Sequence, residues 1–387
     1  MSFDLQRALQ TLIEQEGSDL HLKVPSQPLC RINGELTPIP GTDPLTPADV
    51  EETLAYVLGG DEAKRAEFDR EGEVDFAYAV PGLARFRVNG FRQRGVVSIV
   101  MRAIPFGIKT IEELQLPPVI QALAEEERGI VLVTGTTGSG KSTTLAAMVD
   151  HINSTRPRHV VTIEDPIEFL HVDKRSIINQ REIGQDTLDF KSALRRVLRQ
   201  DPDVILIGEM RDEETVQTAL SAAETGHLVF STVHTVDATE TVNRMIEFFP
   251  PHMHNQVRSM LAGTLKGVIS QRLVPSASGG RVAACEILRM TGRVRDMIMD
   301  SDQTGRIPEV IADGGYYGMQ TFDQALFGHL KAGRITMEQA VGAASSPHDF
   351  KLLVAADGKR GTTMEDLADA ESRRDTPPPP PAPSLAA

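Results

Sequence analysis

A glycine-rich segment between a short apolar run and a helix-forming stretch constrains this chain more than any other feature. The segment reads GTTGSGKS over residues 135–142, after the apolar run 130–134 and before the helix-forming stretch 143–150. This spacing, in this context, is typical of a phosphate-binding loop. Glycines let successive N–H groups point into one anion-sized cup, and the helix N-terminus adds partial positive charge. The segment therefore predicts a nucleoside triphosphate site.

Individual side chains of this loop have predictable roles. Lys141 offers an ammonium group to the β- and γ-phosphates, and Ser142 offers a hydroxyl to Mg²⁺. Ser142 is therefore the expected metal-binding residue. The residues expected to hold the nucleotide are Gly135, Thr136, Thr137, Gly138, Ser139, Gly140, Lys141, Ser142 and Thr143.

The pattern around the loop predicts an α/β domain over residues 119–350. Its short β-branched runs lack polar alternation, which is typical of strands buried on both faces of a parallel sheet. These runs cover residues 130–134, 160–163, 204–207 and 228–233. Amphipathic stretches between them predict helices over 142–153, 189–200 and 212–225. Ligands are expected at the carboxyl ends of the strands.

Residues 1–105 have a different pattern, typical of a small mixed α+β domain. An amphipathic helix opens it, an Asn33-Gly34 turn follows, and Thr46-Pro47 begins a second helix. Short strands are expected over residues 19–22, 29–32, 74–80, 84–92 and 96–104. Turn residues crowd the stretch 106–118, which predicts a linker. The proline-rich stretch 351–387 is expected to be a disordered tail.

Two acidic residues follow predicted strands at the edge where the nucleotide should lie. The run 203–207 is followed by Gly208 and Glu209, so that glycine stands where a metal-facing aspartate is usual. We expect Glu209 to polarise the attacking water, and the alternative is a structural pair with Arg211. Glu164 ends another strand and is a candidate for positioning water or metal, with a purely structural role as its alternative.

Histidines stand at both ends of the last of these strands. His227 precedes it and His234 follows it, and about 23 Å along an extended segment is too far for one shared metal. His234, at the carboxyl end, is suited to sense a γ-phosphate, whereas His227 could serve a subunit interface. His252 and His254 are interpreted as a solvated loop rather than a ligand set.

Composition excludes several other classes of protein. Acidic residues number 54 against 40 basic ones, for a net charge of −14, which disfavours a nucleic-acid translocase. No apolar run approaches the roughly 20 residues that cross a bilayer, and the N-terminus lacks a signal peptide's apolar core. Cys30 and Cys285 are the only cysteines, so that a four-cysteine zinc site cannot form.

Taken in order, several sequence boxes resemble the secretion ATPases, and more closely the retraction ATPases of type IV pili. The resemblance runs from about residue 3 to 350. The boxes cover residues 18–22, 84–89, 135–142, 162–169, 207–212, 227–234, 268–273 and 318–321.

The resemblance implies a PAS-like N-terminal domain joined by a linker to a RecA-like ATPase domain. It also implies a homohexamer that binds ATP and Mg²⁺ between subunits. Arg85 and Arg87 match family positions from which arginines reach the nucleotide, where they would neutralise charge on the γ-phosphate. Exposed charges alternating along an edge strand are the alternative for these two residues.

For the cell, the resemblance implies an ATP-driven motor for pilus retraction and twitching motility in the bacterial cytoplasm. Its expected partners are an inner-membrane platform protein and a paralogous ATPase, with neither nucleic acid nor zinc. One departure bears on the output: a family helix with two arginines corresponds to residues 293–300, where Arg295 is kept and Met299 replaces the second. A pilus-assembly or type II secretion ATPase, or a weakly hydrolysing accessory protein, is the alternative.

Overall fold

The structure, a computed structural model, describes residues 3–32, 34–104 and 107–357. The chain divides into two compact units. The first contains the chain up to Ile108 together with the short segment Glu168–Leu170, and the second contains the remainder from Lys109 onward. Asn33 of the expected turn, the start of the expected linker at residue 106 and the tail from residue 358 lie outside the described residues.

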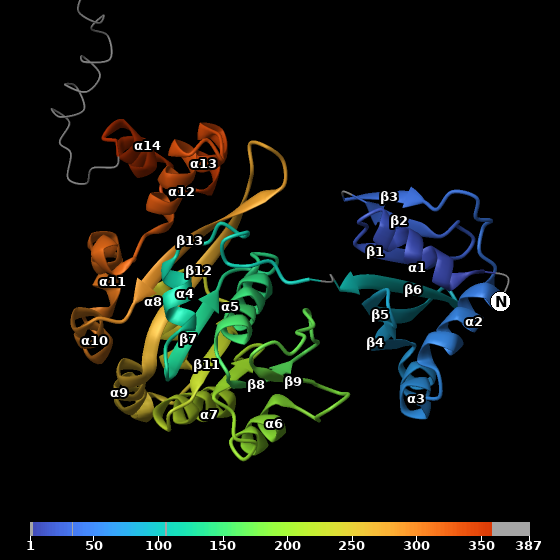
Figure 1. Cartoon of the computed structure of the whole chain (residues 1–387), viewed down its shortest axis with the longest axis horizontal. Coiled ribbons are helices and arrows are strands. Elements are labelled where there is room, and N and C mark those ends of the chain that lie inside the picture. The colour runs from blue at the N-terminus through green and yellow to red at the C-terminus, as the bar shows by residue number, and fades with distance from the viewer. Residues whose placement is uncertain (1–2, 33, 105–106, 358–387) are drawn as a thin grey trace, which may run out of the picture. The chain divides into compact units, whose positions relative to one another are not determined.

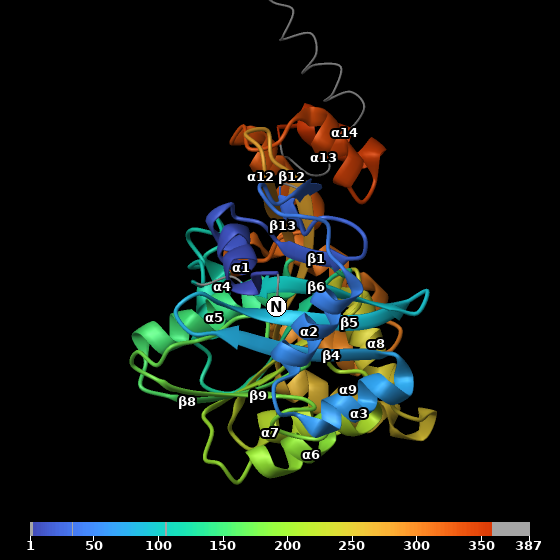
Figure 2. The ribbon, with the colours of Figure 1, turned by 90° about the vertical axis from the view of Figure 1, so that its right-hand side faces the viewer.

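A six-stranded antiparallel sheet forms the centre of the first unit, in the order β3-β2-β1-β6-β5-β4 (Figure 2). The pairing of β5 with both β4 and β6 places it inside the sheet. The strands are β1 (Asp19–Lys23), β2 (Leu29–Ile32), β3 (Glu35–Pro38), β4 (Glu73–Val80), β5 (Ala84–Gln93) and β6 (Val96–Ile104).

The helices of the first unit begin at side-chain caps and pack on this sheet through one apolar core. Asp4 caps α1, and Thr46 with Asp49 forms a capping box at α2. Leu9 and Leu12 of α1 are fully buried in the same cluster as strand residues such as Phe86. The helices are α1 (Leu5–Glu14), α2 (Pro47–Leu58) and α3 (Glu62–Glu71). This arrangement is the expected α+β domain.

The second unit contains a seven-stranded sheet in the order β13-β12-β7-β11-β10-β8-β9 (Figure 1). All neighbouring strands are parallel except β12 and β13, which form an antiparallel hairpin. The strands are β7 (Gly129–Thr134), β8 (His159–Glu164), β9 (Ile177–Glu182), β10 (Val204–Ile207), β11 (Leu228–Val233), β12 (Leu265–Pro275) and β13 (Arg281–Arg289).

Helices cover both faces of this sheet, as the unbroken apolar strands predicted. Successive residues of β7 point to opposite faces: Ile130 and Leu132 pack with α6–α11, whereas Val131 and Val133 pack with α4 and α5. These helices are α4 (Val119–Ala124), α5 (Lys141–Thr155), α6 (Phe190–Val197), α7 (Glu213–Glu224), α8 (Ala238–Glu247), α9 (His254–Thr264), α10 (Gly292–Met299) and α11 (Ile307–Asp313). Three short 3₁₀ turns lie nearby: η1 (Pro251–Met253), η2 (Thr304–Arg306) and η3 (Gly314–Tyr317).

Three further helices, α12 (Phe322–Lys331), α13 (Met337–Ala343) and α14 (Pro347–Ala355), pack beside one end of the β12–β13 hairpin (Figure 1). The expected tail was to begin at residue 351, but α14 continues to Ala355. Ser346 caps this helix, Pro347 stands in its first turn, and Phe350 is fully buried. Because Phe350 packs in the apolar cluster with residues of α12 and α13, the helix continues past residue 350, where the tail was expected to begin.

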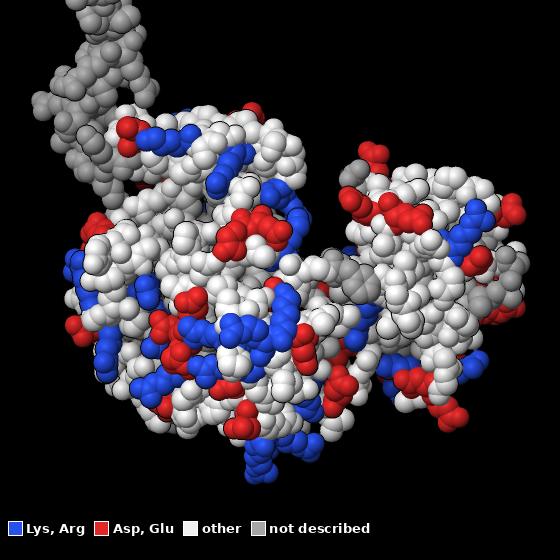
Figure 3. Space-filling model, in the orientation of Figure 1, with Lys and Arg blue, Asp and Glu red and all other residues white. Residues whose placement is uncertain are grey.

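Within the described residues, no helix is both long and apolar enough to cross a bilayer. On the face that Figure 3 shows, basic and acidic side chains lie next to one another over the lower part of the larger unit. The net charge of −14 is therefore not accompanied by a broad basic field on that face.

Candidate functional site

The phosphate loop leaves β7 at Thr134 and enters α5 at Lys141, as its sequence predicted. Gly135, Gly138 and Gly140 have φ of 142°, 78° and 91°, a region that favours glycine. A Cβ atom at Gly135 would also lie 2.5 Å from the Gln271 carbonyl oxygen. Residues 136–138 are exposed at the tip of the loop. The local backbone thus favours glycine at all three positions, and at Gly135 the close carbonyl oxygen also leaves no room for a side chain.

Lys141 and its neighbours occupy the base of this loop. Lys141 is buried, and its Nζ donates hydrogen bonds to the carbonyl oxygens of Gly135 (2.9 Å) and Thr136 (3.0 Å). Ser139 is also buried, and Ser142 and Thr143 lie half-buried in the first turn of α5. The ammonium group is therefore held across the loop by two of the loop's own carbonyl oxygens.

Glu209 follows β10 and Gly208 at the carboxyl end of the sheet, and its side chain is 13% exposed. Arg211 Nη2 lies 2.5 Å from Glu209 Oε1, and His234 Nε2 lies 3.4 Å from Oε2. The structure therefore places Glu209 beside His234, another predicted site residue. It also forms the pair between Glu209 and Arg211 on which the alternative, structural interpretation of Glu209 was based. A carboxylate fixed from both sides is suited to orient a water molecule.

Gly208, which departs from the usual aspartate, lies close to the neighbouring strand. Its N–H donates to the Ile163 carbonyl oxygen at 2.8 Å. A Cβ atom there would lie 3.3 Å from the same oxygen and 3.4 Å from Glu164 Cα. A larger residue would therefore crowd the carboxyl ends of β8 and β10, close to Glu164, which ends β8, and Glu209, which follows β10.

Glu164 is held by two donors. Thr162 Oγ1 donates to Glu164 Oε1 at 2.6 Å, and Gln180 Nε2 donates to the same oxygen at 3.1 Å. Gln180 belongs to β9, which was not predicted because four of its six residues are polar. Of the two donors to Glu164, only Thr162 is close to it in the sequence. The geometry fixes the direction of the Glu164 carboxylate at the edge where ligands of parallel sheets bind.

The histidines of β11 have separate surroundings. His234 lies beside Glu209, whereas the His227 ring contacts the Ala222 carbonyl oxygen (3.0 Å) and Thr225 Oγ1 (3.2 Å) at the end of α7. The interpretation of His254 as part of a solvated loop is wrong. This residue begins α9, and its Nε2 contacts the Phe249 carbonyl oxygen at 2.9 Å.

The predicted arginines lie on β5 of the first unit. Arg85 is half-buried, and Arg87 is exposed with its Nε 3.9 Å from Asp75 Oδ1. The alternative of an edge strand is wrong, because β5 has a neighbour on each side. Both arginines belong to the first unit and the phosphate loop belongs to the second, so that their contact with nucleotide stays a prediction.

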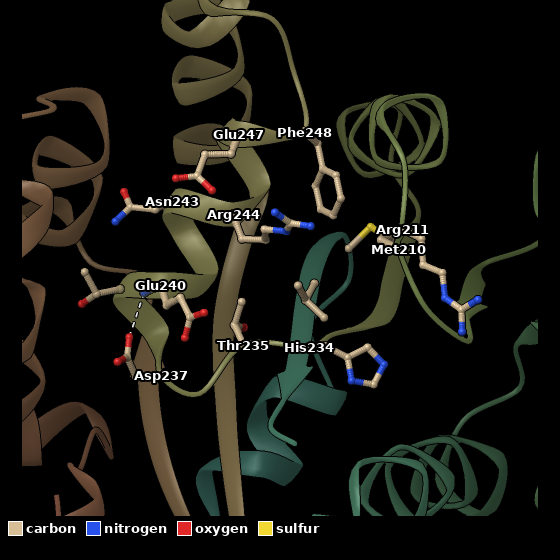
Figure 4. A pocket seen from close by; sticks show the side chains of 12 residues that line it. Met210, Arg211, His234, Thr235, Asp237, Glu240, Asn243, Arg244, Glu247 and Phe248 are labelled. Atoms are coloured by element: carbon tan, nitrogen blue, oxygen red, sulfur yellow. Dashed lines mark hydrogen bonds between the residues drawn. The ribbon is translucent and has the colours of Figure 1, made fainter. Parts of the chain in front are cut away.

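A pocket of about 570 Å³ adjoins Glu209, Arg211 and His234, which we call the Glu209 cluster (Figure 4). Arg211 and His234 lie on one side of it, and α8 supplies the other side. Sequence reasoning missed this pocket because α8 was not among the predicted helices. The acidic and basic side chains that line it are Arg211, Asp237, Glu240, Arg244 and Glu247.

The start of α8 is held by a buried acid from the β12–β13 hairpin. Glu286 Oε1 accepts a hydrogen bond from the Ala238 N–H at 2.9 Å, and Glu286 is only 8% exposed. Burial raises the pKa of the Glu286 carboxyl from 4.5 to about 7, and the negative charges of Asp237 and Asp323 act in the same direction. The Ala238 N–H and the charge of Arg272 oppose this shift.

The raised pKa makes stability depend on pH. Between pH 4.5 and about 7 the unfolded chain loses the Glu286 proton while the folded chain keeps it, so that folding stability falls as pH rises. We expect Glu286→Gln to remove up to about 3 kcal/mol of this fall. Urea unfolding at pH 5 and pH 8 measures it, with the exposed Glu213→Gln as the charge-matched control. An unchanged pH dependence in Glu286→Gln would contradict the prediction.

Comparisons with known proteins agree with these features. The family model described as "Type II/IV secretion system protein" matches residues 84–315. The chain is 46% identical to the Pseudomonas aeruginosa "Type IV pilus retractation ATPase PilT" over 90% of this chain and 100% of that protein. It is 40% identical to the same organism's "Type IV pilus ATPase PilU" over 91% of each chain. A crystal structure of "the Pilus Retraction Motor PilT and Bound ADP" superposes with a TM-score of 0.83 at 43% identity, covering 90% of this chain and 99% of that one.

Proposed function

The chain belongs to the type II/IV secretion system protein family, and on that premise we propose that this PilT-like ATP hydrolase powers the retraction of type IV pili. The observation that carries the proposal is the match to PilT, which spans the whole length of that protein at 46% identity. The parallel sheet, the phosphate loop at its carboxyl edge and the carboxylate of Glu209 beside Arg211 and His234 support the proposal.

In the proposed mechanism, the loop amides and Lys141 bind the triphosphate, and Glu209 orients the attacking water. The Ser142 hydroxyl, in the first turn of α5, fits the known role of this residue type as a ligand of Mg²⁺. When bound, Mg²⁺ neutralises charge on the β- and γ-phosphates. His234 contacts the carboxylate of Glu209 and would report on the γ-phosphate through it. Glu164, fixed by Thr162 and Gln180, is proposed as a second acid that positions water or metal.

Arg85 and Arg87 are proposed to complete the nucleotide site from the N-terminal domain. A guanidinium that meets the γ-phosphate in the transition state can raise the rate by orders of magnitude. The proposed assembly is a hexamer with ATP between subunits, and domain movement on hydrolysis would be the power stroke. The chain is proposed to lie in the bacterial cytoplasm and to bind there to an inner-membrane platform protein.

A second candidate function is that of an accessory ATPase. The observation behind it is the 40% identity to a second type IV pilus ATPase of Pseudomonas aeruginosa, PilU, over 91% of each chain. Met299, which stands where the family's retraction helix has its second arginine, leaves this candidate and pilus assembly open.

The test combines purified protein with complementation. We expect the purified chain to hydrolyse ATP with Mg²⁺ present, and its native mass to be that of a hexamer. In a piliated bacterium that lacks its retraction ATPase, expression of this chain should restore twitching motility. Rescue confined to a strain lacking the accessory ATPase would establish the second candidate. Restored piliation in a strain lacking its assembly ATPase would contradict both.

A further inference from the structure

Strand β12 lies directly beside the phosphate-loop strand β7 (Figure 1). Two of its polar residues, Ser270 and Gln271, are buried. Ser270 pairs in register with Thr134, the last residue of β7, and Thr134 Oγ1 donates to Ser270 Oγ at 3.0 Å. Gln271 follows, and it is only 3% exposed. An amide in the interior is costly unless it is hydrogen-bonded, so that Gln271 requires an explanation beyond packing.

Both ends of the phosphate loop rest against Gln271. Its backbone carbonyl oxygen lies 2.5 Å from where a Cβ atom of Gly135 would be. Its side-chain Nε2 lies 2.8 Å from where a Cβ atom of Gly140 would be. Gly135 begins the loop and Gly140 ends it, so that a single residue of β12 limits the position of both ends.

The Gln271 amide also holds the helix that follows the loop. Thr144 Oγ1 donates to Gln271 Oε1 at 2.8 Å, and both groups are buried. Thr144 belongs to the first turns of α5, where its own N–H donates to the Gly140 carbonyl oxygen at 3.1 Å. The side-chain bond therefore connects β12 to the part of the helix whose N-terminus faces the phosphates.

We propose that Gln271 and Thr144 form a positioning pair that fixes the phosphate loop for nucleotide binding. Neither residue touches the nucleotide in this proposal; they act through the glycines at the two ends of the loop. The proposal rests on residues 135–143 being the nucleotide site. The physical reason is that the loop can direct its N–H groups at a phosphate only if its two ends keep their separation. A displacement of about 1 Å at a site of this kind is enough to lower activity strongly.

The test compares Gln271→Met with Gln320→Met. Methionine keeps the length of the side chain but loses the amide. Gln320 is a matched control because its Nε2 donates to the Cys285 carbonyl oxygen at 2.8 Å, without a contact to the loop. We expect the Kd for ADP to rise about tenfold in Gln271→Met, since a buried hydroxyl loses its acceptor. Gln320→Met should lower the Tm of the nucleotide-free protein and leave the Kd unchanged.

Thr144 gives a second, milder approach that does not depend on how Gln271→Met folds. Thr144→Val removes the same hydrogen bond and should raise the Kd for ADP to a similar extent. Thr144→Ser keeps the hydroxyl and should bind like the wild type. In the double variant Gln271→Met with Thr144→Val, the two effects should not add, because they remove one interaction.

Two outcomes would overturn the proposal. One is an unchanged Kd in Thr144→Val, and the other is a Kd that rises as much in Gln320→Met as in Gln271→Met. Lys141→Met serves as the reference for the site itself. If Lys141→Met also binds ADP like the wild type, the assignment of the nucleotide site is wrong. If it loses binding while the Gln271 and Thr144 variants do not, only the positioning pair is wrong.

Discussion

Replacement of Glu209 with glutamine is expected to lower the rate of ATP hydrolysis by about 10²–10⁴-fold. The amide keeps the size of the side chain and an acceptor oxygen for Arg211, which lies 2.5 Å from Glu209 Oε1 in the native protein. What it loses is the negative charge that draws a proton from the attacking water. The Kd for ADP should therefore stay within about twofold of the wild-type value, since binding depends on the phosphate loop.

Steady-state phosphate release and calorimetric ADP binding, measured on the same preparations, check this prediction. Glu213→Gln is the matched control, because Glu213 is an exposed glutamate at the start of α7 and is not part of the cluster. An undiminished hydrolysis rate in Glu209→Gln would remove Glu209 from its proposed role. A lost ADP affinity would instead assign Glu209 to binding.

Replacement of Lys141 with methionine is expected to weaken ADP binding by about 10²-fold or more. Methionine fills similar space, but it cannot donate to phosphate oxygens, and a charge-assisted hydrogen bond in a buried site is among the strongest available. The variant also loses the bonds from Nζ to the carbonyl oxygens of Gly135 and Thr136. Hydrolysis should fall with binding, because a misplaced γ-phosphate would not meet the water that Glu209 is proposed to orient.

Lys174→Met is the control for this second prediction. Lys174 Nζ lies 2.7 Å from Asp150 Oδ1. Asp150 belongs to α5, the helix that Lys141 begins, but it lies in the second half of that helix, away from the loop. We expect its loss to lower thermal stability slightly and to leave the Kd for ADP unchanged. Titration with ADP in a calorimeter distinguishes the two lysines, and equal affinities in both variants would contradict the prediction.

The parts of the fold that were predictable from sequence are those with local, repetitive signals. β10 and β11 have the predicted bounds, because each is an unbroken β-branched run buried on both faces. The phosphate loop was predictable for the same reason: glycines, lysine and serine at fixed spacing define its backbone and its chemistry without help from distant residues.

The parts that were not predictable depend on partners far away in sequence. β12 contains the polar residues Lys266, Ser270 and Gln271. Ser270 and Gln271 are buried because they form hydrogen bonds with Thr134 and Thr144, which lie far away in the sequence. Around the candidate site, Gln180 and Glu286 have the same character, since their contacts lie on Glu164 and on the start of α8. No spacing in the sequence identifies such pairs.

The β12–β13 hairpin also determines how short a working fragment of this protein can be. Arg272, the neighbour of Gln271, turns to the other side, where its guanidinium lies 3.8 Å from the centre of the Phe322 ring and donates to the Ala343 carbonyl oxygen at 3.1 Å. A fragment that stops before α12 would keep every residue of the phosphate loop and lose the packing on the opposite side of β12. The minimal ATPase fragment is therefore expected to extend at least to Ala343, well past the last strand of the sheet.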